Sequence, residues 1–414
     1  MSPKLPAVLV AAMFASFAFA YFLSALLRAI TATLAPVFSA ELGLGAADLG
    51  LLAGAYFLGF AALQLPLGSA LDRRGPKRVL LAFLALAVFG CAAFALADSF
   101  PALIAARGLI GMGVGACLMA PMTSFRQRLS PSAQMRATSW MLMTGSLGML
   151  ASTLPVQWLL PLFGWRGLFW GFAILLGLAM VAIAAFVPRD LATAGRGARS
   201  GGYGDVFRHP TFRRYLPLGF FNYGGLVAVQ ALWAGPWLTD VCGWTAEQAA
   251  LGLFGINASM LVTFMLWGAV IPHLVHKGGS DRLMARGIPL SLLVVTLALL
   301  LGSHATAWVW AAFCVTSTCV ALTQPAIGQA VPTELTGRAL SAFNLVIFAG
   351  IFAVQWAIGL IIDLTLALGG DKVMAYRAAF SVFAFCCAAS YLWFLWLWHE
   401  LKAVLAGASG RECR

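Results

Sequence analysis

The sequence predicts an all-α membrane protein whose twelve transmembrane helices form two six-helix bundles. Three observations lead to this fold class: the composition, the length of the apolar runs and a weak internal repeat. Of the 414 residues, 62% are hydrophobic and 10% are charged, whereas a soluble protein carries roughly 25% charged residues. Twelve spans of about 20 residues each, with short loops, account for nearly the whole chain. We therefore expect no sizeable water-soluble domain.

The apolar runs give the positions of the expected spans. Each must be a helix, because only helices and closed barrels satisfy the backbone polar groups in lipid, and barrel strands are short and alternating. The first run begins like a signal peptide but continues to about Val37, which predicts an uncleaved first span. The expected spans are residues 7–38, 46–71, 77–97, 100–126, 134–160, 166–188, 213–240, 246–276, 281–303, 307–331, 335–366 and 373–401.

The net charge of +12 comes from basic residues in the short loops between these runs. Most of the 26 Lys and Arg residues fall on one side of the predicted membrane, as the positive-inside rule describes. This places both termini in the cytoplasm and predicts a multi-pass protein of a bacterial inner membrane. The same distribution argues against nucleic acid as a partner, since no basic patch lies outside the loops. The loops on the other side carry acids such as Glu41, Asp98 and Asp240.

The chain divides into two similar halves. We expect a first bundle over 1–188, a flexible Gly-, Ser- and Arg-rich cytoplasmic linker over 189–212, a second bundle over 213–402 and a cytoplasmic tail over 403–414. Four features recur in order, which indicates a duplication with parallel halves, a known plan for transporters. The matched features are Arg74-Gly75 and Lys277-Gly278, Pro121 and Pro325, Arg136-Ala137 and Arg338-Ala339, and Trp165-Arg166 and Tyr376-Arg377.

Two motifs carry a resemblance to a known family. Residues 68–78 read GSALDRRGPKR, similar to the G-x-x-x-D-R-x-G-R-[KR] signature of the major facilitator superfamily, although Pro76 replaces the usual basic residue. Residues 107–113 read RGLIGMG, which resembles that superfamily's R-x-x-x-G-x-G motif. The resemblance implies alternating access by two rocking bundles. It also implies a latch that stabilises the outward-facing state, formed here by Gly68, Asp72, Arg73, Gly75 and Arg78. The alternative is an ordinary solvated basic loop.

Two arginines lie inside spans, Arg28 in the first and Arg107 in the fourth. An arginine at this depth is costly unless it lines a wet cavity or has a partner. No Asp or Glu lies at that depth in the first six spans. We therefore predict a positive cavity suited to a carboxylate or another anion. The alternative is a structural bond to backbone carbonyls, and for Arg107 the resemblance also implies proton coupling or packing.

Other polar residues predict the rest of a site between the halves. Tyr21 shares one helix face with Arg28. The remaining candidates are Tyr56, Gln230, Trp233, Asn257 and Gln355, each of which can instead join neighbouring helices. Gly235-Pro236 in the seventh span predicts a break that acts as a gate or as a static kink.

Several other functions are disfavoured. We find no phosphate-binding loop, nucleophile elbow or zinc-ligand set, so we expect neither an enzyme nor a cofactor. His273 and His276 lack a third ligand, so no metal site is expected. The sequence thus predicts a monomeric secondary transporter in a lipid bilayer that takes up a small organic anion with protons. The alternatives are proton-linked efflux of drugs or metabolites and a transport-inactive membrane sensor. Leu154 before Pro155 departs from the superfamily's antiporter motif, which disfavours efflux.

Overall fold

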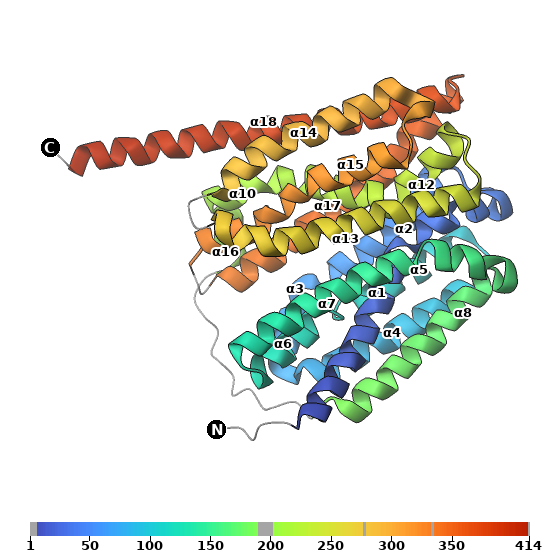
Figure 1. The fold of residues 1–414 in the computed structure, drawn as a ribbon, viewed down its shortest axis with the longest axis horizontal. Helices are drawn as coiled ribbons and strands as arrows, with labels where there is room; N and C mark the ends of the chain where they lie inside the picture. The colour runs from blue at the N-terminus through green and yellow to red at the C-terminus, as the bar shows by residue number, and fades with distance from the viewer. Residues whose placement is uncertain (1–5, 189–201, 276–278, 333–334, 413–414) are drawn as a thin grey trace.

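The computed structural model describes residues 6–188, 202–275, 279–332 and 335–412. Within these ranges the secondary structure is helical throughout, and the helices form two bundles that lie side by side (Figure 1). The first half of the chain forms the lower bundle in that view and the second half forms the upper one. We call the end with the loops 43–45, 97–99 and 368–371 the outer end, because the charge distribution predicts that it faces away from the cytoplasm.

The first bundle contains six spans, and three of them are bent. The second span is interrupted at Leu63, the fourth at residues 115–118, and the fifth at Ser152 and Thr153. Gly164, with φ 63° and ψ 169°, has a non-helical backbone, and the kink there separates the fifth span from the sixth within the range of α8. The helices are α1 (Ala7–Leu42), α2 (Ala46–Ala62), α3 (Gln64–Arg74), α4 (Pro76–Leu96), α5 (Phe100–Val114), α6 (Met119–Arg128), α7 (Pro131–Ala151) and α8 (Leu154–Phe186).

The second bundle follows a short helix, α9 (Tyr203–Arg208). Its first span alternates between α-helical and wider π-helical turns, and its fourth span contains a tighter 3₁₀ segment. The elements are α10 (Pro210–Pro217), η1 (Leu218–Tyr223), α11 (Gly224–Ala228), η2 (Val229–Trp233), α12 (Ala234–Pro236), η3 (Trp237–Val241), α13 (Ala246–Val275), α14 (Gly279–Leu301), η4 (Gly302–His304), α15 (Ala307–Ser317), η5 (Thr318–Leu322), α16 (Thr323–Ala330), α17 (Thr336–Ala367) and α18 (Lys372–Glu412).

The predicted fold class is confirmed. Ten helices of the described chain are long and apolar enough to cross a membrane. The two other predicted spans are also helical: 134–160 is interrupted at Ser152 and Thr153, and 213–240 is a helical run that alternates between α- and π-helical turns.

Three predicted boundaries were wrong. Helix α1 continues to Leu42 and ends at Gly43, whose φ of 64° suits a residue without a side chain. Helix α18 runs to Glu412, well past residue 401. Part of the predicted linker is helical, as α9, while residues 189–201 lie outside the described structure.

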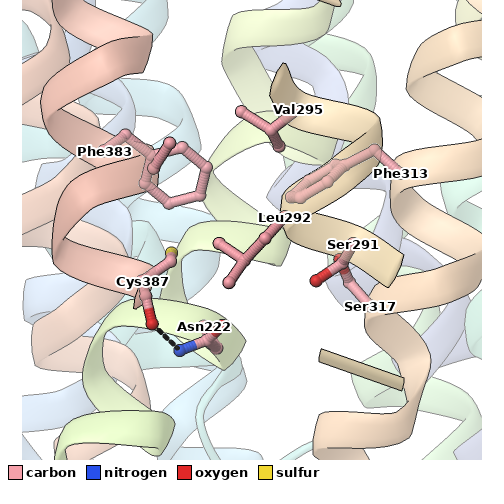
Figure 2. A pocket seen from close by; sticks show the side chains of 9 residues that line it. Asn222, Ser291, Leu292, Val295, Phe313, Ser317, Phe383 and Cys387 are labelled. Carbon is pink, nitrogen blue, oxygen red and sulfur yellow. Dashed lines mark hydrogen bonds between the residues drawn. The ribbon is translucent and has the colours of Figure 1, made fainter. Parts of the chain in front are cut away.

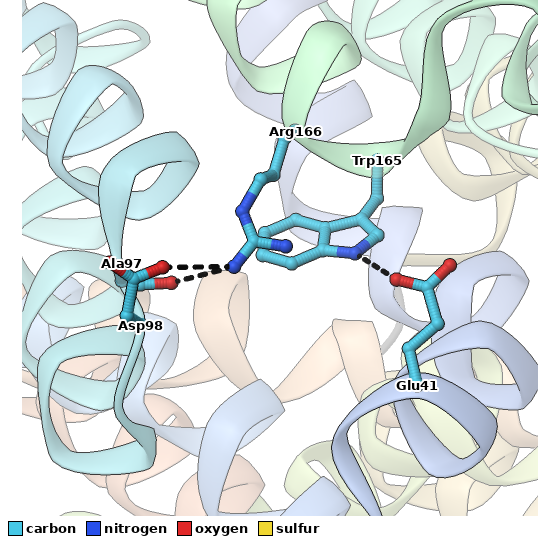
Figure 3. A network of polar contacts seen from close by, with 5 residues as sticks. All are labelled: Glu41, Ala97, Asp98, Trp165 and Arg166. Carbon is cyan, nitrogen blue, oxygen red and sulfur yellow. Dashed lines mark hydrogen bonds and ion pairs between the residues drawn. The ribbon is translucent and has the colours of Figure 1, made fainter.

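The repeat seen in the sequence recurs as matching contacts at the outer end. In the first bundle, Trp165 Nε1 donates to Glu41 at 2.7 Å and Arg166 Nη2 donates to the Ala97 carbonyl at 3.1 Å (Figure 3). In the second, the Tyr376 hydroxyl donates to Asp240 at 2.8 Å and Arg377 Nη2 donates to the Leu300 carbonyl at 3.2 Å. In each half, therefore, the start of the sixth span is tied to the ends of the first and third. This correspondence supports an ancestral duplication.

The two bundles meet most closely along α2 and α17, where glycines let the backbones touch. An added Cβ at Gly50 would overlap the Gln355 carbonyl, and one at Gly359 would overlap the Ala46 carbonyl. Toward the inner end, Phe60 and Phe348 pack across the same seam with ring centres 4.3 Å apart. Small residues at such crossings are typical of membrane helices, whose association depends on close packing rather than on the hydrophobic effect.

The two glycines of the 107–113 motif have a similar packing role inside the first bundle. A Cβ at Gly111 would overlap the Tyr56 carbonyl of α2, and a Cβ at Gly113 would overlap the Ala87 backbone of α4. Helix α5 therefore lies against both neighbours without intervening side chains. This contact fixes the position of Arg107, four residues earlier on α5.

We predict that Gly111→Ala lowers the free energy of unfolding by about 1–3 kcal/mol, because the added methyl must push α5 away from α2. The matched control is Gly177→Ala on α8, where an added Cβ meets nothing within 4 Å. Since alanine is the better helix former, the control should be unchanged or slightly stabilised. Unfolding temperatures of the purified proteins, followed by tryptophan fluorescence, measure both effects. Equal stability of the two variants would contradict the packing role of Gly111.

Candidate functional site

Arg28 on α1 lies among aromatic side chains and lacks an acidic partner. Its guanidinium carbon is 6.0 Å from the centre of the Phe60 ring. The hydroxyls of Tyr21, Tyr56 and Tyr223 lie within electrostatic range of the guanidinium. Its Nε is buried and donates no hydrogen bond, and within the described chain no Asp or Glu forms an ion pair with it. Arg28 is thus a membrane-embedded cation with donor capacity that the protein leaves unused.

The residues beside Arg28 are positioned by neighbouring helices. The Tyr56 hydroxyl on α2 donates to the Ser24 carbonyl at 3.0 Å, which fixes the ring against α1. The Tyr21 ring packs against Gly145 of α7, where any larger side chain would displace it. The Ser24 hydroxyl is buried without a partner. Ser24 lies between Tyr21 and Arg28 at helical spacing on α1, so the face predicted for those two residues holds two unsatisfied polar groups, the Ser24 hydroxyl and Arg28 Nε.

Arg107 is placed differently, although it also contacts Tyr56. It is fully buried, and its Nη2 donates to the Leu27 carbonyl at 2.8 Å and to Thr31 Oγ1 at 2.6 Å. Its guanidinium carbon is 5.1 Å from the centre of the Tyr56 ring. These contacts match the structural alternative, in which the arginine bonds to a backbone carbonyl and a hydroxyl, while its Nε and Nη1 are buried without a partner. A direct substrate contact by Arg107 stays a prediction.

The candidate residues of the second half form two pairs. Gln230 Nε2 donates to Asn257 Oδ1 at 2.8 Å, and Asn257 Nδ2 donates to the Leu253 carbonyl at 3.0 Å. This pair joins the seventh span to α13, as the interhelical alternative predicts. Trp233 Nε1 donates to the Gln355 carbonyl at 3.1 Å. The Gln355 amide is fully buried and both its polar atoms lack a partner. Substrate contact by these four residues stays a prediction.

Tyr223 is the residue that the sequence analysis missed. It ends the π-helical turn η1 and lies within electrostatic range of Arg28 and Tyr21. It therefore brings a hydroxyl of the second bundle to the arginine of the first. The π-helical turns that place it are frequent at functional sites, but the sequence analysis did not expect them. Pro217 immediately before η1 was the only local signal.

Gly235 and Pro236 do not break the seventh span in this conformation. Both lie in α12 with helical backbone angles on either side, and the wider turns η2 and η3 flank them. A Cβ at Gly235 would come within 2.7 Å of the Ala32 carbonyl, so this glycine permits close contact with α1. The predicted break is therefore absent here, and a gating role for the pair stays a prediction.

The predicted latch at residues 68–78 forms a tight turn. Gly75, with φ 82°, joins α3 to α4, while Arg73 and Arg78 are exposed. Gly68 faces open space, so the close approach expected there is absent in this conformation. The side chain of Asp72 lies outside the described residues. The latch role of these five residues stays a prediction.

Lys77, beside the latch residues, bonds to its own bundle. Its Nζ donates to the carbonyls of Ala184 and Val187 at 2.8 and 2.6 Å. Val187 follows the last residue of α8, so the lysine satisfies carbonyls that a helix end leaves unpaired.

A small hollow inside the second bundle is not the predicted site. Figure 2 shows its lining, which is mostly apolar, with Asn222 donating to the Cys387 carbonyl at 3.3 Å. It does not reach Arg28 or the first bundle. In the part of the chain that the structure describes, no cluster of His, Cys, Asp and Glu could hold a metal ion. The His273 and His276 side chains lie outside the described residues.

We predict that Arg107→Gln lowers the free energy of unfolding by about 1.5–3 kcal/mol, because charge-assisted hydrogen bonds between α5 and α1 are lost. The exposed Arg282 provides the control, since Arg282→Gln removes the same charge without a buried contact. Thermal unfolding in detergent without added solute compares the two variants. A melting temperature of Arg107→Gln equal to that of the control would show that Arg107 is not structural.

The sequence of this chain is similar to those of known bacterial proteins over part of its length. Curated proteins that align with the chain include multidrug resistance proteins named MdtL. That of Shigella dysenteriae serotype 1 (strain Sd197) is 28% identical over 157 residues, and that of Escherichia coli (strain K12 / DH10B) is 27% identical over 157 residues. Each match covers 37% of this chain and 39% of the relative.

Solved structures resemble the chain over nearly its full length. A bacterial homolog to the human lysosomal transporter Spinster, in an inward-facing and unoccupied conformation, matches with a TM-score of 0.75 and 15% identity. That match covers 95% of this chain and 98% of the other. A D-xylose-proton symporter matches with a TM-score of 0.72 and 15% identity, covering 94% and 96%. These identities show a shared fold alone.

The family model described as Major Facilitator Superfamily matches residues 17–355, which include the 68–78 and 107–113 motifs and both sides of the bundle interface. The chain is therefore a multi-pass membrane protein of the major facilitator superfamily.

Proposed function

We propose that this transporter moves a small organic anion across a bacterial inner membrane, by proton-coupled uptake with alternating access. The observation that carries the proposal is the position of Arg28, whose Nε has no protein partner and whose side chain, unlike that of Arg107, is only half-buried. A cation in a membrane protein marks a substrate or ion pathway unless the protein itself neutralises it. A carboxylate fits an arginine well, because the guanidinium can donate two parallel hydrogen bonds to it.

The two arginines inside the spans differ in their surroundings, since Arg28 is half-buried and Arg107 is fully buried. Arg107 donates to Leu27 and Thr31, so its charge is partly compensated within the bundle. Arg28 instead has three tyrosine hydroxyls within electrostatic range; that of Tyr56 donates to the Ser24 carbonyl, and those of Tyr21 and Tyr223 are able to donate to an anion. We therefore assign the anion contact to Arg28 and a supporting role to Tyr21 and Tyr56.

The position of Tyr223 suggests how binding couples to the movement of the bundles. Arg28 belongs to the first bundle and Tyr223 to the second. The two side chains lie within electrostatic range of each other. An anion held by both groups binds better when the bundles are correctly spaced around it. Such differential binding is what a ligand needs in order to shift a conformational equilibrium.

Proton coupling follows in this proposal from the substrate itself. In the described chain no Asp or Glu is ion-paired with Arg28 or Arg107. A proton that crosses with the anion, rather than on a central carboxylate, is consistent with that arrangement. Uptake measured with and without a pH gradient tests this part.

We predict that Arg28→Gln weakens binding of the cognate anion at least about tenfold, since a charge-assisted hydrogen bond is lost. A thermal-shift screen of small carboxylates against the purified protein identifies the ligand, because ligands that bind the folded state raise its stability. Arg166→Gln is the control, as Arg166 is a half-exposed residue at the outer end. Transport of the same solute into proteoliposomes then gives its direction.

If Arg28→Gln responds to every anionic hit as the unmodified protein does, the assignment of Arg28 fails. Hits restricted to cationic or lipophilic compounds would reject an anionic substrate altogether.

Efflux of drugs or metabolites is the second candidate. The similarity to the MdtL proteins favours it, although the match spans 39% of their length. Expression of the chain in a drug-sensitive bacterium should then raise the inhibitory concentration of several compounds. Unchanged inhibitory concentrations, together with accumulation of an anion, would favour uptake.

A further inference from the structure

We infer that Asp363 of α17 is an outer latch, which holds the outer ends of the two bundles together by capping the first turn of α2. This contact lies at the opposite end from residues 68–78 and involves none of the residues assigned to the substrate. It concerns the transport cycle of the superfamily and holds for any substrate and either direction.

The contact consists of two hydrogen bonds between the bundles. The backbone N–H groups of Ala46 and Ala47, the first two residues of α2, donate to the two carboxylate oxygens of Asp363 at 3.0 and 2.8 Å. The residues are more than three hundred positions apart in the chain, so only the approach of the two bundles brings them together. Asp363 is partly buried there.

The start of α2 depends on this carboxylate for its hydrogen bonds. The first N–H groups of a helix have no partner within the helix and need one from outside. Asp48 of α2 itself accepts from the Gly45 N–H at 3.1 Å, and Leu49 N–H donates to the Gly45 carbonyl at 3.0 Å. The N–H groups of Ala46 and Ala47 are satisfied by the other bundle. When the outer ends separate, these two donors and the carboxylate must all return to water.

Charge adds to the hydrogen bonds. The N-terminus of a helix carries a partial positive charge, which stabilises a nearby carboxylate. The glycine seam places Asp363 at this position, since a Cβ on Gly359 would overlap the Ala46 carbonyl and one on Gly45 would come within 3.0 Å of Asp363 Oδ2. Close backbone packing and the capped helix end thus support the same closed outer arrangement.

The second bundle offers a matched carboxylate at the same end. Asp371 Oδ1 accepts from the Met374 N–H at 2.7 Å and so caps α18, but this bond lies within one bundle. Asp371 therefore has the chemistry of Asp363 without a contact between the bundles. A substitution at Asp371 therefore distinguishes the loss of any helix cap from the loss of a contact between the bundles.

The test measures the distance between the bundles at the outer end. Spin labels on cysteines at the exposed positions Leu162 and Leu368, in a cysteine-free version of the full chain in lipid nanodiscs, report that distance by pulsed electron resonance. Asp363→Ala should raise the outer-open population about fivefold, as expected for the loss of a helix cap. Asp363→Asn, which keeps one acceptor but loses the charge, should give a smaller increase. Asp371→Ala should leave the distribution unchanged.

Gly359→Val tests the packing contribution separately, because it wedges the seam open while the carboxylate stays. If Gly359→Val opens the outer end and Asp363→Ala does not, the glycine seam alone holds it closed and the latch is rejected. Equal opening by Asp363→Ala and Asp371→Ala would also reject it. Since no substrate is needed, these results are independent of whether an anion is transported.

Discussion

Along α2 and α17 the two bundles touch backbone to backbone, and much of the remaining structure depends on this contact. Gly50 and Gly359 remove the side chains that would otherwise hold the helices apart. The contact brings Asp363 to the start of α2 and packs Phe60 on Phe348. In lipid there is little hydrophobic gain from joining two apolar surfaces, so close packing and hydrogen bonds must hold the bundles together. Packing and hydrogen bonds hold the closed seam, and no covalent bond has to break when it opens.

Within each bundle, polar contacts at the outer end complement the apolar packing in the middle. Trp165 and Tyr376 bind Glu41 and Asp240 in equivalent places, and Arg166 and Arg377 bind backbone carbonyls in equivalent places. Each bundle is therefore held together at its outer end by the same pattern of hydrogen bonds. Two internally braced units joined by a narrow seam can move as rigid bodies, which is what alternating access requires.

Arg28 and Arg107, the two arginines inside the spans, have different surroundings. Arg107 lies against the glycine-mediated contact of α5 with α2 and donates through Nη2 within the bundle, while its Nε and Nη1 are buried without a partner. Arg28 projects among tyrosines from both bundles and keeps a buried donor unused. Tyr56 contacts both, since its hydroxyl bonds to α1 and its ring faces Arg107. A change at the Arg28 site can therefore reach the packed interior of the first bundle through a single aromatic side chain.

The sequence by itself determined the class of the protein, the helical fold, the twofold repeat and the family, because spans in lipid must be long, apolar and helical. It also identified Arg28 and Arg107 as unusual, since charge inside a span is costly wherever the helix packs. Only the tertiary structure decided that Arg107 is bonded within its bundle, that Gln230 and Asn257 bond to each other, and that Tyr223 lies near Arg28. The sequence places Asp363 near the outer end of its span, but it does not reveal that this carboxylate caps α2. These outcomes depend on how helices far apart in the chain rotate and approach each other, and helix rotation is set by packing between spans that are apolar on nearly every face.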